Sequence, residues 1–388
     1  MRLFFVVLSA VAMLFSAHAS AQQSQITPAA DLPHNINSGP FKAGHIQGIA
    51  VDQECKYVYY SYTTMLIKTD LAGNVIGSVT GLLGHLGDLD FNPQDGRVYG
   101  SLEYKNDGIG KGILQMENKG SMKLDNAFYI AIFDVDRITR MNMDAEKDAV
   151  MTTVYLPTVL EDYLAKVTVD GVLHDHRLGC SGIDGVAFGP RFGSADGKWY
   201  LTTTYGVYSD TKRSDNDYQV ILQYDVSDWR KYEQTLSQER MHQNGPAKPN
   251  GQFFAFTGNT TYGVQNLEYD SERKVWWMAV YKGKKEEYPN YLLYAVDGTA
   301  KPQKTALQGV PYVKKGLVVP LCTRFASLNN PQSGVCGWNF AVGSTGLAHI
   351  GDGLFYISHN YKNDSGQGST IRLYKFNGKA SGPFEQVK

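Results

Sequence analysis

The chain has little cysteine, no excess of charge of one sign, and no long apolar run beyond its first residues. Four of its 388 residues are Cys, and the formal net charge is −1. Near-neutral charge argues against a partner such as nucleic acid or an anionic membrane that is bound through bulk charge. No later segment has the roughly 20 consecutive apolar residues of a membrane-spanning helix. P-loop, Gly-x-Ser-x-Gly, Cys-x-x-Cys and His-Glu-x-x-His motifs are also absent.

The first 21 residues have the pattern of a signal peptide. A basic start at Arg2 precedes an apolar run over residues 3–15, and the small residues 19–21 follow. The run is too short to span a bilayer, and we expect cleavage before Gln22. We therefore expect an exported protein, periplasmic or secreted, with one domain over residues 22–388.

The four cysteines suggest one disulfide. Cys322 and Cys336 flank a loop rich in Pro, Asn, Ser and Gly, and a disulfide between them is expected to close it. Cys55 and Cys180 fall at opposite ends of a predicted blade, so they are not expected to pair. The alternative is that all four thiols are free.

A five-residue pattern recurs five times along the chain. It reads Gly or His, usually an aliphatic residue, a mostly polar residue, Gly, Asp or Asn, and then an aliphatic residue. The copies are residues 45–49, 85–89, 182–186, 263–267 and 343–347. After each copy come a turn and a strand that is rich in β-branched and aromatic residues and ends on Tyr. Such repeats predict an all-β fold, a five-bladed β-propeller with these copies as inner strands.

The outer strands are harder to place. Fourth strands are predicted at residues 74–79, 150–155, 234–237 and 303–307. For the last blade, we expect either residues 384–387 or a strand from residues 22–36, which would pair the two ends of the chain. A sixth blade within residues 160–177 is the alternative to five.

The inner strands at residues 48–52 (Gly-Ile-Ala-Val-Asp) and 185–189 (Gly-Val-Ala-Phe-Gly) resemble those of NHL and SMP-30-like propellers. The resemblance covers the strand pattern of each blade and implies a propeller. In SMP-30-like enzymes, Glu, Asn and Asp side chains hold a divalent metal on a six-bladed ring. The matching positions here offer Asp88, Asp184 and Asn266, and the early Glu is missing.

One face of the predicted propeller collects the long loops and the reactive side chains. Inner strands start and second strands end on this face, so we expect it to bind the ligand. Its candidate residues are His45, Gln47, His85, Asp88, Asp184, Gln265 and Asn266 from inner strands, and Tyr62, Glu103, Tyr104, Tyr205, Tyr281, Lys282, His359 and Tyr361 from second-strand ends.

Asp88 and Asp184 are the candidate acid and base for cleaving a glycosidic bond, or the ligands of a hard cation such as Ca²⁺. The alternative is that each caps backbone amides where blades meet. Glu103 and Glu268 are candidates for a third carboxylate.

His45, His85 and His359 offer a different chemistry. One of them as base, with Tyr205 or Tyr281 as proton donor, would suit a polysaccharide lyase. Lys282 or Arg213 would then neutralise the uronate carboxylate. The alternative is that these histidines are structural.

We therefore expect an exported propeller that binds a small polar ligand, such as an oligosaccharide, and acts on it as a hydrolase or a lyase. The expected catalytic residues are Asp88, Asp184, His45, His85, Tyr205 and His359. The expected substrate-binding residues are Gln47, Glu103, Tyr104, Arg213, Gln265, Asn266, Tyr281, Lys282 and Tyr361. Two alternatives stay open: a non-catalytic glycan- or protein-binding propeller, and a metal-dependent lactonase or phosphoesterase. Any cofactor, possible Ca²⁺ included, and the oligomeric state are also open.

Overall fold

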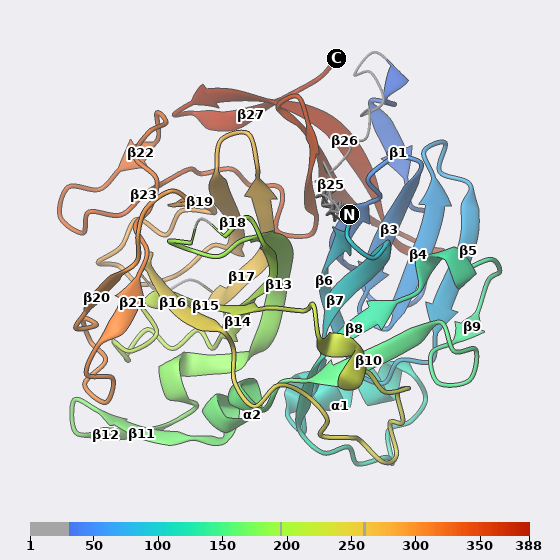
Figure 1. Cartoon of the computed structure of the whole chain (residues 1–388), viewed down its shortest axis with the longest axis horizontal. Coiled ribbons are helices and arrows are strands. Elements are labelled where there is room, and N and C mark those ends of the chain that lie inside the picture. Colours follow the sequence, from blue (N-terminus) through green and yellow to red (C-terminus); the bar gives the residue numbers. More distant parts are fainter. Residues whose placement is uncertain (1–30, 195, 259–260) are drawn as a thin grey trace, which may run out of the picture.

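The computed structural model describes residues 31–194, 196–258 and 261–388. Five mainly antiparallel sheets stand around one axis, and the colours in Figure 1 follow the chain around this ring. Each inner strand contacts the next: β2 contacts β6, β6 contacts β13, β13 contacts β17, β17 contacts β24, and β24 contacts β2. This closed ring confirms the predicted five-bladed propeller. The predicted signal peptide lies outside the described residues.

The first two blades match their predicted strands to within a few residues. Blade 1 consists of β2 (Ile46–Val51), β3 (Tyr57–Tyr62), β4 (Met65–Asp70) and β5 (Val75–Thr80), with β9 (Met143–Asp144) parallel to β5. Blade 2 consists of β6 (His85–Asn92), β7 (Arg97–Tyr104), β8 (Ala127–Phe133) and β10 (Met151–Tyr155). The helix α1 (Gly108–Met116) is inserted between β7 and β8.

Blades 3 and 4 have outer edges that differ from the prediction. Blade 3 consists of β13 (Cys180–Pro190), β14 (Trp199–Val207), β15 (Tyr218–Tyr224) and β16 (Gly251–Phe256), extended by β21 (Gly316–Val318) and β20 (Gln303–Thr305). Blade 4 consists of β17 (Thr261–Asp270), β18 (Val275–Tyr281) and β19 (Leu293–Asp297), with the small hairpin of β22 (Leu328–Asn329) and β23 (Cys336–Gly337) nearby. The predicted strand at residues 234–237 was wrong, since Gln234 only bridges Thr153 at the edge of blade 2. The strand predicted at residues 303–307 exists as β20 but joins blade 3.

Blade 5 closes the ring with both ends of the described chain. It consists of β24 (Leu347–Gly351), β25 (Leu354–Asn363), β26 (Gly366–Lys379), β27 (Gly382–Gln386) and β1 (Asn35–Asn37). β1 pairs with β26 at residues 370–372, and β27 pairs with β26 further along. Figure 1 shows β1, in blue, beside β26, in red. β1 overlaps only the end of the expected segment 22–36, whose residues 22–30 lie outside the described residues, and β27 overlaps the expected residues 384–387. Strands from both alternatives thus pair with β26.

Residues 160–177 do not form a sixth blade. They contain part of α2 (Pro157–Leu164) and a separate hairpin of β11 (Lys166–Val169) and β12 (Val172–Asp175). The short 3-10 helices are Val135–Arg137, Arg177–Gly179 and Trp229–Lys231. Within the described ranges, no helix has the length and apolar character needed to cross a membrane.

The hydrophobic core is divided among the junctions between blades. One cluster lies at each of the five junctions, and aromatic rings dominate several of them. Between blades 2 and 3, for example, Tyr99 packs edge-on against Phe188 with centroids 5.0 Å apart. Such burial fixes the inner strands and thereby the side chains at their starts.

The disulfide expected between Cys322 and Cys336 is not formed in this structure. All four thiols are free and buried in this structure. Sγ of Cys336 lies 3.8 Å from the backbone oxygen of Cys322 and so faces the main chain there. Cys322 itself packs into the apolar cluster between blades 4 and 5.

Candidate functional site

A cavity of about 260 Å³ opens where the inner strands begin. Four of the five blades contribute side chains to it. Its lining consists of His45, Gln47, Thr63, His85, Glu103, Lys105, Ile109, Ile113, Ser181, Asp184, Tyr262, Gln265 and Tyr281. Most of these side chains are polar, and the volume suits a ligand of about the size of a monosaccharide.

The third residue of the repeat lines the cavity in three blades. These residues are Gln47, Asp184 and Gln265. The Nε2 of Gln265 donates to Oδ2 of Asp184 at 3.1 Å, and Nε2 of Gln47 donates to Oγ1 of Thr63 at 3.1 Å. Neighbouring blades therefore hold each other's polar groups in place around the axis.

The fourth residue of the repeat lies deeper, on the axis itself. One carboxylate oxygen of Asp88 accepts the backbone N–H of Val186 and of Leu267, both at 2.9 Å. A Cβ at Gly48 would lie 2.5 Å from the other Asp88 oxygen, so the glycine makes room for this carboxylate. Nδ2 of Asn266 similarly donates to the backbone oxygen of Gln47 at 2.6 Å. Asp88 and Asn266 thus tie blades together below the cavity.

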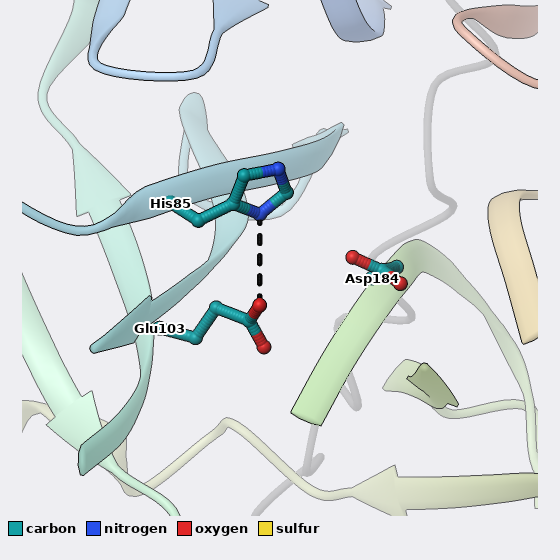
Figure 2. Close-up of side chains that lie close together, drawn as sticks. All are labelled: His85, Glu103 and Asp184. Atoms are coloured by element: carbon teal, nitrogen blue, oxygen red, sulfur yellow. Dashed lines mark ion pairs between the residues drawn. The ribbon is translucent and has the colours of Figure 1, made fainter. Parts of the chain in front are cut away.

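Three donor side chains converge at one side of the cavity. Figure 2 shows His85 and Glu103 facing each other, with Asp184 across from them. One donor atom from each lies within 4.8 Å of the other two. His85 begins β6, Glu103 is near the end of β7, and Asp184 comes from β13. Two adjacent blades therefore build this cluster.

Lys105 neutralises one of the two carboxylates. Its Nζ lies 2.5 Å from Oε1 of Glu103, and the two side chains are 4% and 3% exposed. Oε2 of Glu103 accepts the backbone N–H of Ile183 at 3.1 Å, and Nζ of Lys105 donates to the backbone oxygen of Ser181 at 2.9 Å. Burial raises the pKa of Glu103, Lys105 and the Ile183 N–H oppose this shift, and both carboxylate oxygens are largely occupied by the protein.

Asp184 and His85 both favour their neutral forms. Burial, reinforced by the negative charge of Glu103 and opposed by Lys105, raises the pKa of Asp184 to about 8. Burial lowers the pKa of His85 to about 3, and the positive charge of Lys105 adds to this. Burial also lowers the pKa of His45. At neutral pH the cavity therefore presents a protonated carboxyl group beside neutral imidazoles.

His85 leaves one ring nitrogen for a ligand. Its Nδ1 is buried and has no hydrogen-bond partner among the described residues. The nearest carboxylate oxygen, Oε1 of Glu103, is 3.8 Å away, which is too long for a hydrogen bond. A buried nitrogen without a partner is unusual, and a ligand hydroxyl can satisfy it.

The helix α1 forms one wall of the site. The side chain of Asp107 caps its start by accepting the N–H groups of Ile109 and Gly110. Tyr208 Oη donates to Asp107, and Thr64 Oγ1 donates to Glu117 at the other end. These contacts attach α1 to blades 3 and 1. A second cavity of about 420 Å³, next to the first, lies between α1 and residues 120–124.

Two tyrosines stand at the opposite wall. Tyr262 is 47% exposed and has a φ of +64°, an uncommon conformation for a bulky residue. Its ring meets that of Tyr281 edge-on, with centroids 6.1 Å apart. Burial, together with the nearby Asp184, raises the pKa of Tyr281 to about 12. An exposed aromatic face beside a polar cavity suits stacking on a sugar ring.

The donor set of His85, Glu103 and Asp184 does not fit a metal ion well. The ammonium group of Lys105 already supplies positive charge at Glu103, on the oxygen closest to His85. A divalent cation bound to that oxygen would face Lys105 across a very short distance.

The structure brings some of the predicted residues to the cavity and leaves others elsewhere. The residues at the central cavity are His45, Gln47, His85, Glu103, Asp184, Gln265 and Tyr281. Tyr104 lines the neighbouring cavity, and its hydroxyl donates to Gln238. Asp88 and Asn266 lie below the site, as described above.

The remaining predicted residues have partners away from the cavity. Tyr205 is buried and donates to Asp162, His359 is 2.9 Å from the Tyr374 hydroxyl, and Tyr361 donates to Asn37. Arg213 forms a buried ion pair with Asp215. Lys282 is exposed and does not line the cavity. The first four side chains therefore have structural partners, and none of the five lines the cavity.

Sequence reasoning missed several lining residues. They are Thr63, Lys105, Ile109, Ile113, Ser181 and Tyr262. Lys105 carried a usable signal, because side chains two residues apart on a strand share a face, and Glu103 was already a candidate. Ile109 and Ile113 belong to the inserted helix, and no repeat pattern indicated where that helix would lie.

Comparison with known proteins gives no family. No family model matches the chain, and neither does any curated protein. The NHL and SMP-30-like resemblance therefore remains one of strand pattern.

Solved structures show only distant similarity. Hydrazine synthase of Kuenenia stuttgartiensis is 11% identical over 90% of this chain, with a TM-score of 0.31. The Dos1 propeller is 10% identical over 88%, with a TM-score of 0.31. A Trichoderma reesei carbohydrate-active enzyme of family AA12, in a calcium structure, is 10% identical over 84% of this chain and 80% of its own, with a TM-score of 0.35. This chain spans 66% and 58% of the first two. At such identities and TM-scores, these similarities bear on neither ligand nor reaction.

Proposed function

We propose that the protein is an exported hydrolase that binds a small neutral saccharide in the central cavity and cleaves it by acid–base catalysis. The observation that carries this proposal is that the Asp184 carboxyl group, held by Gln265, lines the same cavity as His45 and His85. Burial raises the pKa of Asp184 and lowers those of the two histidines, which favours their neutral forms. Groups whose environments push their pKa values apart are typical of acid and base pairs.

In this reaction, Asp184 is the general acid. With a pKa of about 8 it holds a proton at neutral pH and gives it to the leaving oxygen of the scissile bond. His45 is the general base, because its imidazole is neutral and lines the same cavity. It takes a proton from the attacking water. His85, whose pKa lies too low for an effective base, orients a substrate hydroxyl through its free Nδ1.

Hydrolysis is favoured over the lyase reaction because the latter requires a cation for the uronate. Lys105 is paired with Glu103 and Arg213 with Asp215, both in buried positions. Among the cavity-lining residues in the described part of the chain, Lys105 is the one Lys or Arg. A neutral sugar therefore suits the cavity better than an acidic one.

A binding protein without turnover is the second candidate. Glycosidases commonly use two accessible carboxyl groups, whereas Glu103 is 3% exposed and is held by Lys105 and by the N–H of Ile183. This occupancy favours a site that recognises a sugar through hydrogen bonds. Gln47, Gln265 and Tyr262 would then supply most of the contacts.

The test is product analysis with the protein lacking residues 1–21. The purified chain is incubated with neutral and uronic-acid oligosaccharides, and the products are identified by mass. Fragments that have gained one water support hydrolysis, and unsaturated fragments support the lyase instead. Binding of a sugar without any product, measured by calorimetry, supports the second candidate. If the panel gives no products and no sugar binds, the proposal of a saccharide ligand is overturned.

The variant Asp184→Asn separates catalysis from binding. If Asp184 is the acid, turnover falls by orders of magnitude and sugar affinity changes little. Asp364→Asn, in an exposed turn, is the matched control because it makes the same chemical change away from the cavity.

A further inference from the structure

The face opposite the central cavity carries a second cluster of donor side chains. Asp270 ends β17, Glu272 lies in the turn that follows, and His349 belongs to β24 of the next blade. One oxygen of each carboxylate and a ring nitrogen of His349 lie within 4.8 Å of one another. β17 and β24 are in contact, so the cluster joins blade 4 to blade 5.

His349 faces the two carboxylates without a hydrogen bond to either. Its side chain is 7% exposed, and Nε2 has no hydrogen-bond partner among the described residues. Nε2 lies 3.6 Å from Oε1 of Glu272 and 3.9 Å from Oδ1 of Asp270. The ring packs on Phe355 with centroids 4.9 Å apart, which holds its orientation. A buried nitrogen in this position lacks the partner that such groups normally have.

The two carboxylates are held from the other side by Arg273. Its Nη1 lies 3.0 Å from Oδ2 of Asp270 and 3.2 Å from Oε2 of Glu272, and its guanidinium stacks on Phe376. The remaining oxygens, Oδ1 and Oε1, are the ones that face His349. Oδ1 also accepts turn amides, and Oε1 accepts the N–H of Gly353 at 3.2 Å. Such outer contacts orient carboxylates for a bound metal ion.

An ion can reach the cluster from solvent. A cavity of about 390 Å³ opens beside it, lined among others by Asp90, Glu268, Ser271 and His349. Burial raises the pKa of Asp90 to about 7 and moves that of Glu268 well above its usual range, so these two side chains line the entrance with carboxyl oxygens rather than with two full negative charges. The side chain of Glu272 is 37% exposed and completes the path.

We propose that this cluster binds a divalent transition-metal ion of the Zn²⁺ class, through Nε2 of His349 and one oxygen each of Asp270 and Glu272. An imidazole with two carboxylates is a donor set that suits Zn²⁺, whereas Ca²⁺ and Mg²⁺ prefer oxygen ligands alone. The bound ion joins blade 4 to the blade that holds both ends of the described chain. Its role is therefore to secure the ring, independently of the reaction proposed for the other face.

The experiment is a calorimetric titration of ZnCl₂ into the chelator-treated full mature chain. We expect one high-affinity site, with an affinity at least tenfold lower in Glu272→Gln and in His349→Gln. His85→Gln is the matched control because it removes an imidazole from the other donor cluster. It should bind Zn²⁺ as the unaltered chain does.

Thermal unfolding gives a second readout. Zn²⁺ should raise the unfolding temperature of the unaltered chain and of His85→Gln, but not that of Glu272→Gln. If His349→Gln does not fold, Glu272→Gln decides alone, since its amide oxygen can still accept the Gly353 N–H. The proposal is overturned if the unaltered chain does not bind Zn²⁺. It is also overturned if binding is lost in His85→Gln and retained in Glu272→Gln.

Discussion

The ammonium group of Lys105 lies 2.5 Å from a carboxylate oxygen of Glu103, and both side chains are almost completely buried. This ion pair borders Asp184, and its two charges act on that carboxyl group in opposite directions. Glu103 raises the pKa of Asp184 and Lys105 lowers it. Burial is the largest cause of the raised pKa of Asp184, and the pair adjusts that pKa although neither partner is free to react.

Replacing Lys105 with Met should destabilise the protein by about 3 to 5 kcal/mol, because the Glu103 carboxylate is left as a buried charge without a counterion. The double variant Glu103→Gln with Lys105→Met removes both charges and should recover most of that loss. Urea unfolding of the two variants measures the difference. A single variant no less stable than the double one would show that the pair carries little energy.

The catalytic rate should fall as the pH rises through about 8. Asp184 must be protonated to act as an acid, and its pKa is raised to about 8. Asp184→Asn should lower the rate by about 10² to 10⁴-fold, the usual contribution of a general acid. The measurement is a pH–rate profile of kcat/KM with the saccharide that is found to be cleaved. A profile that stays flat from pH 6 to pH 10 would remove Asp184 from the acid role.

The same proton links stability to pH. The folded protein holds it up to about pH 8, whereas the unfolded chain releases it near the ordinary value of 3.8. Stability from this group is therefore complete below about pH 4 and is lost progressively up to about pH 8. We expect the free energy of unfolding of the unaltered chain, minus that of Asp184→Asn, to be smaller at pH 8.5 than at pH 5. Both values are measured by urea unfolding. The change to Asn leaves the other titrating groups in place, so their effects cancel.

The inner strands and the Tyr-ending second strands were predictable because each blade repeats the same turn and the same apolar pattern. The sequence did not indicate in which direction the polar side chains of these strands point. Register shifts interrupt the strand pairing between Leu86 and Leu89, and between Ile183 and Val186. Simple alternation therefore fails within these repeats, and Asp88 points to the axis whereas Asp184 lines the cavity.

The outer strands of blades 3 and 4 were not predicted correctly, whereas β5 and β10 of blades 1 and 2 match the predicted residues 74–79 and 150–155. A fourth strand pairs with only one neighbour of its own blade, so it lacks the pattern of a strand buried on both edges. β16 begins at Gly251, after a long segment that follows β15. This strand was instead predicted at residues 234–237, because no local feature distinguishes that segment from residues 251–256.

Asp88 should matter for stability rather than for turnover. Its carboxylate accepts the backbone N–H of Val186 and of Leu267, from two other blades. Asp88→Ala leaves both amides buried without an acceptor, at a cost of about 1 to 3 kcal/mol each. The urea midpoint should fall accordingly, while sugar binding by the folded fraction persists. If Asp88→Ala is as stable as the unaltered protein but has no turnover, Asp88 is a catalytic residue after all.

Ring closure by β1 can be tested at its one buried side chain. Ile36 pairs with Ile371 of β26, is 2% exposed, and packs in the cluster between blades 5 and 1. Ile36→Ala should therefore lower the free energy of unfolding by about 2 to 5 kcal/mol, the usual cost of such a cavity. Asn35→Ala is the control, because Asn35 lies in the same strand with its side chain exposed. Hydrogen exchange at the Ile371 amide should accelerate in Ile36→Ala and stay slow in Asn35→Ala. Equal effects of the two variants would mean that β1 contributes only its backbone hydrogen bonds, and that the ring is held closed by β27 and the contacts between inner strands.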